Sequence, residues 1–285
     1  NEIWIGLQLD VRDLIRTFQP VSNLTNEWDW NGIKSPNVAT FYAAQDGEAF
    51  PQTVDKARVA LAPGKRVSEI ISAPREGEHG YFVATAIQPT DLGTEYTQPI
   101  ARIHGTGPAG NPSVWSNRIL TSSTMQYTPL ALDLVDVSRS INFQSPVING
   151  VREFHINGEI FPNTPVFQPR ANRVEEWTVT NVDPIPHPIH IHMQSFQAQA
   201  YRLGDAGFTI PPHFFDQDVW YMDSNTISTL RIRWKPTLGE GVFHCHNLLH
   251  EDGGMMALLN VIPEMPFLVG GDASGGGVIR FFPQK

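Results

Sequence analysis

The sequence predicts an all-β fold made of two β-sandwich domains. Hydrophobic residues make up 41% of the chain and charged residues 17%, with 23 glycines and 23 prolines, a balance that suits a loop-rich β protein better than a helical bundle. Short β-rich stretches separated by turn residues recur along the chain. At 285 residues, the chain is long enough for two domains that each bury a core.

Five stretches carry the strand prediction. Each is rich in β-branched, aromatic or other apolar residues and is separated from the next by turn-forming residues. In chain order they are residues 58–73, 80–87, 174–182, 228–234 and 255–262. Pro63 and Gly64 predict a turn inside the first stretch, and the Gly-Glu-Gly run at 239–241 predicts a break after the fourth.

A stretch rich in Gly, Pro, Ser and Thr, from about residue 105 to residue 129, predicts a connection between domains. We therefore expect a first domain over residues 1–105, a linker over 106–129 and a second domain over 130–285. The run GGDASGGG at 270–277 predicts a flexible surface loop or tail. The first residues include neither a Met nor a signal-peptide pattern, so we expect a processed or cut N-terminus.

Composition and charge disfavour two classes of partner. The net charge of −9 is spread without basic runs, so we expect no nucleic-acid partner. No apolar run approaches the roughly 20 residues of a membrane helix, so we expect no membrane partner. The sequon Asn23-Leu24-Thr25 is compatible with secretion and favours an extracellular or periplasmic location. The chain has one cysteine, Cys245, and so cannot form an internal disulfide.

Most of the ten histidines fall in two dense clusters. The first is HPIHIH at 187–192, and the second begins with HCH at 244–246 and runs through residue 255. In a strand, side chains alternate between faces, so His190 and His192 project together. The same alternation places His244 and His246 on one face and Cys245 on the other. We therefore expect Cys245 to bridge two metal centres.

The donor types fit copper. A thiolate, two imidazoles and a weak thioether form the ligand set of a blue copper site, and His187, Cys245, His250 and Met255 provide that set. The remaining histidines are neutral nitrogen donors suited to copper ions that bind and reduce dioxygen. They are His190, His192, His244 and His246. Four such ligands are too few to hold three coppers.

The motif HPxHxH, followed about fifty residues later by HCHxxxHxxxxM, resembles the pair of C-terminal copper motifs of the multicopper oxidases. HPIHIH and FHCHNLLHEDGGMM look most like the bilirubin oxidase and spore-coat laccase branch. The likeness covers most of residues 37–262, which resemble the middle and third domains of that family. It implies two cupredoxin-like Greek-key β-sandwiches.

The resemblance also implies a role for each ligand. His187, Cys245 and His250 would bind the type 1 copper, with Met255 as its axial ligand. His190 would bind the type 2 copper. The type 3 pair would be held by His192, His244 and His246.

One departure from the family pattern is large. The family takes four further cluster histidines from two HxH motifs in its N-terminal domain, and this chain has neither. We expect a separate N-terminal chain, or a cleaved N-terminal fragment, to supply them and complete a shared trinuclear cluster. A two-domain laccase would carry HxH pairs in its own first domain. The other histidines are interpreted as structural; they are His79, His104, His155 and His213.

Three further side chains receive an interpretation. By resemblance, Glu251 delivers protons for dioxygen reduction; the less favoured alternative is that Glu251 and Asp252 form a solvated acidic pair. Asp218 aligns with a family aspartate near the type 1 site and would hold a ligand there through a hydrogen bond. Met256 is expected to be a core residue, as is Trp177.

The activity implied by the resemblance is laccase-like: one-electron oxidation of a small aromatic donor, phenol or amine, with dioxygen reduced to water. Electrons would enter near His187, the ligand expected to approach the surface, and pass through Cys245. A thioether at the axial position should lower the type 1 potential relative to relatives with Leu or Phe there. The alternatives are a blue copper electron carrier without oxygen chemistry and a zinc hydrolase.

Overall fold

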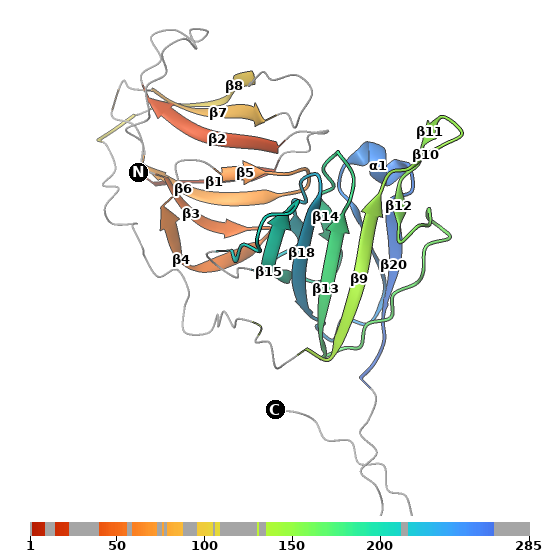
Figure 1. The fold of residues 1–285 in the computed structure, drawn as a ribbon. Helices are drawn as coiled ribbons and strands as arrows, with labels where there is room; N and C mark the ends of the chain where they lie inside the picture. The colour runs from red at the N-terminus through yellow and green to blue at the C-terminus, as the bar shows by residue number, and fades with distance from the viewer. Residues whose placement is uncertain are drawn as a thin grey trace, which may run out of the picture.

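The computed structural model describes residues 2–8, 15–22, 40–55, 59–72, 76, 79–87, 96–104, 106–108, 130, 135–211 and 216–264 (Figure 1). Within these ranges the chain forms strands β1 to β20 and one helix of five residues, α1 (Leu248–Asp252). This confirms the all-β prediction. No helix in the described ranges is long and apolar enough to span a membrane.

The N-terminal part contains two four-stranded sheets, ordered β1-β6-β3-β4 and β5-β2-β7-β8, with every pairing antiparallel. The bounds of its strands are β1 Glu2–Gln8, β2 Ile15–Ser22, β3 Thr40–Gln45, β4 Glu48–Asp55, β5 Val59–Leu61, β6 Arg66–Ser72, β7 His79–Ile87 and β8 Tyr96–His104. Pro63 and Gly64 form a turn between β5 and β6, as the sequence predicts.

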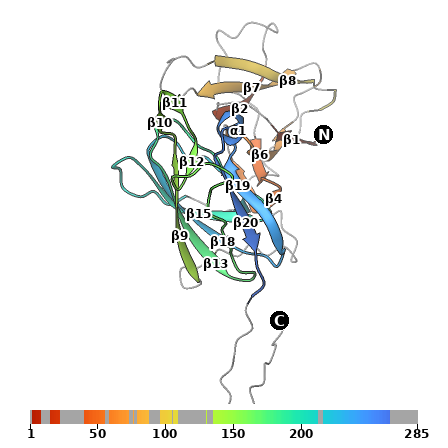
Figure 2. The same cartoon turned by 90° about the vertical axis from the view of Figure 1, so that its right-hand side faces the viewer.

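The C-terminal part contains a six-stranded sheet, ordered β12-β9-β13-β18-β15-β16, and a four-stranded sheet, ordered β17-β14-β19-β20. A two-stranded hairpin, β10-β11, stands apart from both (Figure 2). The bounds are β9 Val137–Gln144, β10 Val147–Ile148, β11 Val151–Arg152, β12 His155–Ile156, β13 Val174–Asn181, β14 Ile189–Ile191, β15 Phe196–Leu203, β16 Asp216–Gln217, β17 Val219–Trp220, β18 Thr226–Arg233, β19 Gly239–Cys245 and β20 Met256–Val261.

The predicted strands are present, with one error. The five stretches named from the sequence contain β5 with β6, β7, β13, most of β18, and β20. Residues 239–241, which predict a break, instead open β19, where their backbone pairs with residues 259–261 of β20. Gly239, the first residue of β19, has a positive φ of 116°, a conformation that favours glycine, and the strand continues from there.

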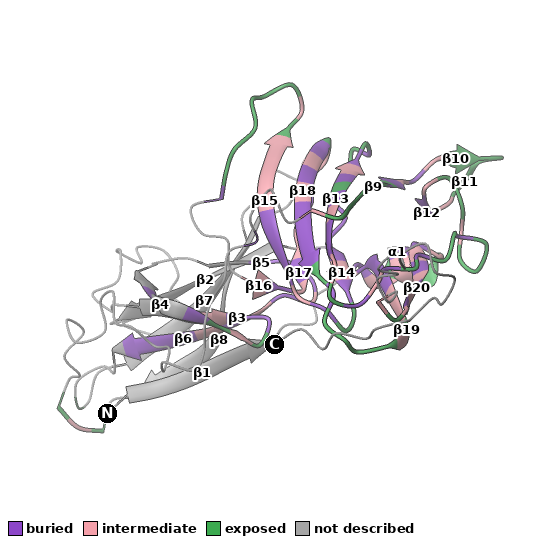
Figure 3. Ribbon diagram, turned by 90° about the horizontal axis from the view of Figure 1, so that it is seen from below, coloured by how far each residue is buried: buried purple, intermediate pink, exposed green. Residues whose placement is uncertain are grey.

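A core of apolar side chains lies between the two C-terminal sheets. Trp177 of β13 is fully buried and meets Phe243 of β19 edge to face, with 5.1 Å between ring centroids. Its indole N–H donates to Glu175 at 2.9 Å, so the buried ring leaves no polar group unpaired. Buried residues follow the inner faces of β13 and β18 (Figure 3). The interpretation of Trp177 as a core residue is confirmed.

No described hydrogen-bonded sheet joins strands from before residue 105 to strands from after residue 136. The domain boundary itself stays a prediction, because residues 109–129 lie outside the described ranges. The sequon at 23–25 and the glycine-rich run at 270–277 lie outside them too.

Replacing Trp177 with Ala should lower the free energy of unfolding by about 3–5 kcal/mol, because it removes a large ring from a closed core. Urea unfolding measures the change. The matched control is Ile210→Ala, at a side chain that is 67% exposed, which should stay within about 0.5 kcal/mol of the parent protein. Similar losses in both variants would show that Trp177 does not anchor the core.

Candidate metal centres

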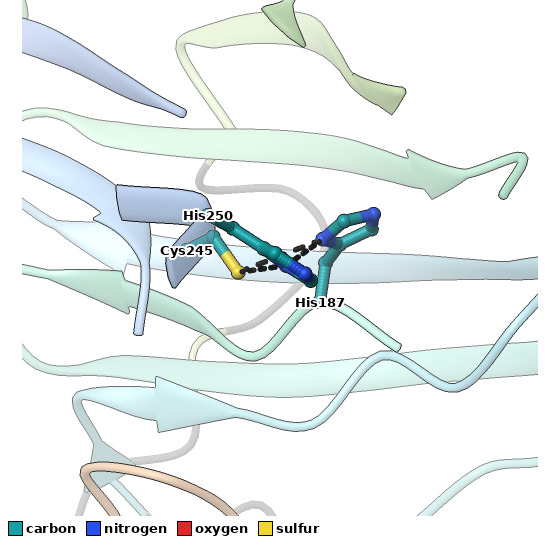
Figure 4. Close-up of side chains that lie close together, drawn as sticks. All are labelled: His187, Cys245 and His250. Carbon is teal, nitrogen blue, oxygen red and sulfur yellow. Dashed lines mark hydrogen bonds between the residues drawn. The ribbon is translucent and has the colours of Figure 1, made fainter. Parts of the chain in front are cut away.

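Three donor atoms converge inside the C-terminal domain in a cysteine-centred cluster formed by His187, Cys245 and His250 (Figure 4). The Cys245 Sγ atom lies 3.6 Å from Nδ1 of each histidine, and the two Nδ1 atoms lie 3.1 Å apart. Three donors at these separations can all reach one ion at ordinary metal–ligand lengths of about 2.0–2.3 Å. A thiolate with two imidazoles is a set that selects copper.

Secondary structure sets the positions of these donors. Cys245 ends β19, and its backbone N–H donates to Met255 O at 3.0 Å. His250 lies on α1, a helix whose N-cap is Asn247. The loop then turns back tightly through Gly254, with φ of +97°, where a Cβ atom would lie 2.3 Å from Ile160. Only glycine fits that conformation without strain, so this turn fixes the spacing between His250 and Met255.

Met255 follows the cysteine-centred cluster in sequence and belongs to the same buried core. Its backbone N–H donates to His250 O at 3.0 Å, and its side chain is fully buried in the same core as Cys245. The expectation that Met256 is the core residue was wrong, because Met256 is partly exposed on β20 while Met255 is buried. The alternation of side chains along this segment allows only one of two adjacent methionines to face inward.

A buried carboxylate supports His187 from behind. Asp183 Oδ2 accepts a hydrogen bond from His187 Nε2 at 2.7 Å, which leaves Nδ1 of the ring facing Cys245. Burial raises the pKa of Asp183, but the hydrogen bonds from His187 and Ser145 outweigh that effect and hold the pKa below its usual value. Sequence reasoning missed Asp183, although its place four residues before His187 was a usable signal.

Two expectations about this cluster were wrong. Asp218 was expected to support the type 1 ligands, but its carboxylate binds Arg66 and its carbonyl oxygen accepts from His190. His187 was expected to approach the surface, but its side chain is fully buried. Both errors have the same cause, since burial and long-range partners depend on how β14, β17 and β19 pair.

Four histidines form an imidazole cluster on the opposite side of β19: His190, His192, His244 and His246. The Nε2 atoms of His192 and His244 lie 3.1 Å apart, and His190 joins them in a set of nearby donor atoms. The ring of His246 lies 5.4 Å, centroid to centroid, from the rings of both His190 and His244. The antiparallel pairing of β14 with β19 sets His190 beside His244.

Adjacent residues on β19 therefore serve different clusters. Cys245 points into the core toward His187 and His250, while His244 points away toward His192. This is the arrangement that the alternation of side chains along a strand predicts.

Burial favours the neutral form of four of the clustered imidazoles. Burial and the neighbouring histidines of its cluster together lower the pKa of His244 to about 3, against an opposing hydrogen bond to Cys245 O. Burial, together with His187, lowers the pKa of His250 to about 3. Burial also lowers the pKa of His190 and of His192. Neutral rings keep the lone pairs that metal ions need.

An unpaired nitrogen also fits metal binding. Among the described residues, His246 Nδ1 is buried and has no hydrogen-bond partner, a cost that a coordinated ion or a further partner would relieve. By contrast, His155 satisfies both ring nitrogens, with Gly158 O and Glu153 Oε2 each at 2.9 Å, so its structural interpretation is confirmed. The side chains of His79 and His104, and all of His213, lie outside the described set.

Glu251 lies beside the imidazole cluster. Its Oε2 atom is 3.2 Å from Nδ1 of His244, and its side chain is partly exposed. Asp252, the next residue, is exposed. The two acidic residues thus differ, since Glu251 connects solvent to a cluster imidazole.

Comparisons with known proteins agree with this geometry. The model of the multicopper oxidase family matches residues 127–265. The chain is 33% identical to a bilirubin oxidase from Albifimbria verrucaria over 41% of the chain and 20% of that protein. It is 24% identical to a laccase from Bacillus subtilis over 92% of the chain and 53% of that protein.

Solved structures show the same fold. A multicopper oxidase from Campylobacter jejuni, described as a metallo-oxidase, superposes with a TM-score of 0.67 at 20% identity, covering 88% of this chain and 51% of the other. This agreement confirms the cupredoxin-like fold. The chain spans only about a fifth to a half of the length of the curated relatives it matches.

The lowered pKa values predict how the metal-free protein responds to acid. In the unfolded chain His244 and His250 bind protons below about pH 6.5, whereas in the folded chain they do so only near pH 3. The unfolded state thus binds more protons, so stability falls as pH drops through this window. His250→Gln should flatten the dependence of unfolding free energy on pH by up to one proton, measured by urea unfolding. His155→Gln is the control, and an unchanged slope in His250→Gln would contradict the prediction.

Proposed function

Residues 127–265 form a domain of the multicopper oxidase family, and from that premise we propose that the chain is the C-terminal portion of a laccase-like enzyme. The enzyme would take single electrons from phenolic or aromatic amine donors and reduce dioxygen to water. The observation that carries this proposal is the pair of clusters joined through adjacent residues, Cys245 and His244. When bound, copper supplies one-electron transfer at the first cluster and four-electron reduction of dioxygen at the second.

The residues divide between the two tasks. His187, Cys245 and His250 would hold the type 1 copper, with Met255 as axial ligand. His190 would hold the type 2 copper, and His192, His244 and His246 the type 3 pair. Because Cys245 is covalently continuous with its neighbours, it gives electrons a short path through bonds between clusters.

Protons need a separate path, since reduction of dioxygen to two waters consumes four of them. Glu251 suits this task because its carboxylate lies 3.2 Å from His244 Nδ1 and is also reached by solvent. It can accept a proton from outside and hold it at the edge of the imidazole cluster. Asp252 has no such contact among those described, and we interpret it as a solvated surface residue.

The imidazole cluster needs ligands from elsewhere. Four histidines are too few for three coppers, and His192 is exposed, so the cluster is open on one side. We propose that an N-terminal chain or fragment with two HxH motifs covers this side and completes a shared site. An extracellular or periplasmic location is part of the proposal. Intact mass spectrometry of the purified protein would show a co-purifying chain, or a longer precursor, if this is correct.

A blue copper electron carrier is the second candidate. It is favoured by one observation, that the cysteine-centred cluster is closed and buried within this chain while the imidazole cluster is open. A carrier, however, leaves four gathered imidazoles without a purpose. A colourless, zinc-loaded protein would instead support a hydrolase.

Copper content and oxygen uptake decide between the oxidase and the carrier. In the oxidase, the double variant His244→Gln, His246→Gln should keep the blue absorption of the type 1 site and lose the other coppers. Oxygen uptake should fall by more than about 100-fold, since losing groups that merely orient ligands already costs about 10–100-fold. His155→Gln is the control. A parent protein with one copper and no oxygen uptake, any partner retained, would establish the carrier.

The axial position has its own test. Met255→Leu should raise the type 1 reduction potential, because it removes a weak donor that stabilises the oxidised copper. Redox titration of the blue absorption measures the change. Met256→Leu alters the neighbouring, partly exposed methionine and should leave the potential unchanged. If only the Met256 variant shifted, the axial assignment would be wrong.

A further inference from the structure

A turn from the N-terminal sheets reaches the strand that supports the imidazole cluster. This clamp consists of Asp46, between β3 and β4, and residues 63–66, which form the turn after β5 and the first residue of β6. Its partner is the segment 216–219, which contains β16 and the first residue of β17. No clamp residue belongs to either group of metal donors. The clamp nevertheless reaches two histidines of the imidazole cluster, His190 through Asp218 and His246 through Gly64.

The base of the clamp is a buried ion pair. Lys65 Nζ donates to Asp46 Oδ2 and to Gln217 Oε1, each at 2.7 Å, and to Val219 O at 3.0 Å. Asp46 Oδ2 in turn accepts from the backbone N–H groups of Asp218 and Val219 at 3.2 and 3.3 Å. All three donors of Lys65 Nζ are used, and the Asp46 side chain is fully buried. The ion pair therefore fixes the position of residues 217–219.

The first arm acts on His190. Arg66 holds both carboxylate oxygens of Asp218 with two parallel hydrogen bonds of 2.7 Å. The carbonyl oxygen of Asp218 accepts from His190 Nδ1 at 2.8 Å. That bond places the ring proton on Nδ1 and leaves Nε2 of His190 as the lone-pair donor.

The second arm acts on His246. Gly64 has a φ of +78°, and a Cβ atom added there would lie 2.4 Å from Cδ2 of the His246 ring. Glycine is thus required both by the backbone conformation and by the closeness of the imidazole. Arg66 ties this turn to the first arm, since its Nη1 also donates to Gly64 O at 3.0 Å.

We propose that this clamp positions the second copper centre: Arg66, acting through Asp218, sets the tautomer and direction of His190, and Gly64 sets the ring of His246. The N-terminal sheets would thereby preorganise a metal site to which they give no ligand. Such partners of a ligand typically change metal affinity by about 10–100-fold. The inference rests on the proposed function for the identity of the metal, but its geometry can be tested without copper.

The test on copper-loaded protein, with any co-purifying chain retained, uses Arg66→Gln. We expect the blue type 1 absorption to persist, while the type 2 signal in electron paramagnetic resonance weakens or changes its hyperfine splitting. Copper affinity at that site should fall by about 10–100-fold. Arg66→Lys keeps the positive charge but cannot donate to both carboxylate oxygens in the paired geometry of the guanidinium group. It should recover part of the type 2 signal.

The matched control is Arg139→Gln. Arg139, whose side chain is about as exposed as that of Arg66, also makes a two-bond ion pair, with Glu175 at 2.7 Å for both bonds, but between β9 and β13. It should lose stability without altering the type 2 signal. Gly64→Ala should instead disturb the imidazole cluster through His246, which would help to hold the type 3 pair. It should lower the copper content of that cluster while the blue type 1 absorption persists, even if it also lowers the melting temperature.

A second readout keeps this inference separate from the proposed function. In metal-free protein, nitrogen-15 spectra should show His190 as a single tautomer protonated on Nδ1, and Arg66→Gln should convert it to a mixture while Arg139→Gln does not. A parent protein that lacks type 2 copper would refute the oxidase proposal, while this spectrum still decides the positioning role. An unchanged His190 tautomer together with an unchanged type 2 signal in Arg66→Gln would overturn the clamp.

Discussion

The alternation of side chains across one strand is the constraint on which the two centres depend. At the end of β19, Cys245 faces the core while His244 faces the other way, and no rotation of side chains can exchange them. The neighbouring strand obeys the same rule, since Ile189 and Ile191 are fully buried while His190, between them, is not. A slip of one residue in the pairing of β14 with β19 would exchange the faces and separate the donors at 187–192 from those at 244–250.

Gathering so many imidazoles has an electrostatic cost that the fold accepts. Burial and the closeness of the rings to one another lower the pKa values of His190, His192, His244 and His250, so their lone pairs stay available. The hydrogen bonds at the far side of His187 and of His190 then decide which nitrogen faces the metal. Neutral rings and a fixed tautomer would let each site bind an ion without rearranging.

Local pattern and spacing were enough for the five named strand stretches and for the donor residues that the structure gathers in the two clusters. The composition of the stretch 174–182 is enough to predict a strand. The adjacency of His244 and Cys245 is enough to predict that their side chains point to opposite faces. What the sequence could not predict depends on contacts between distant segments. Arg66 and Asp218 are 152 residues apart, so nothing local indicates their pairing. The burial of His187 was missed for the same reason, because it depends on which strands cover it.

The closed state of the cysteine-centred cluster has a consequence for how the protein acquires its metal. His187 and Cys245 are fully buried, and His250 is 6% exposed, so an ion cannot diffuse to the three donors while the fold is intact. One short segment beside them is α1, which carries His250 and the outward-facing Leu249 and ends in a glycine turn. The rate at which an ion enters or leaves this centre would then depend on how often the fold opens locally, as well as on how strongly the donors bind the ion.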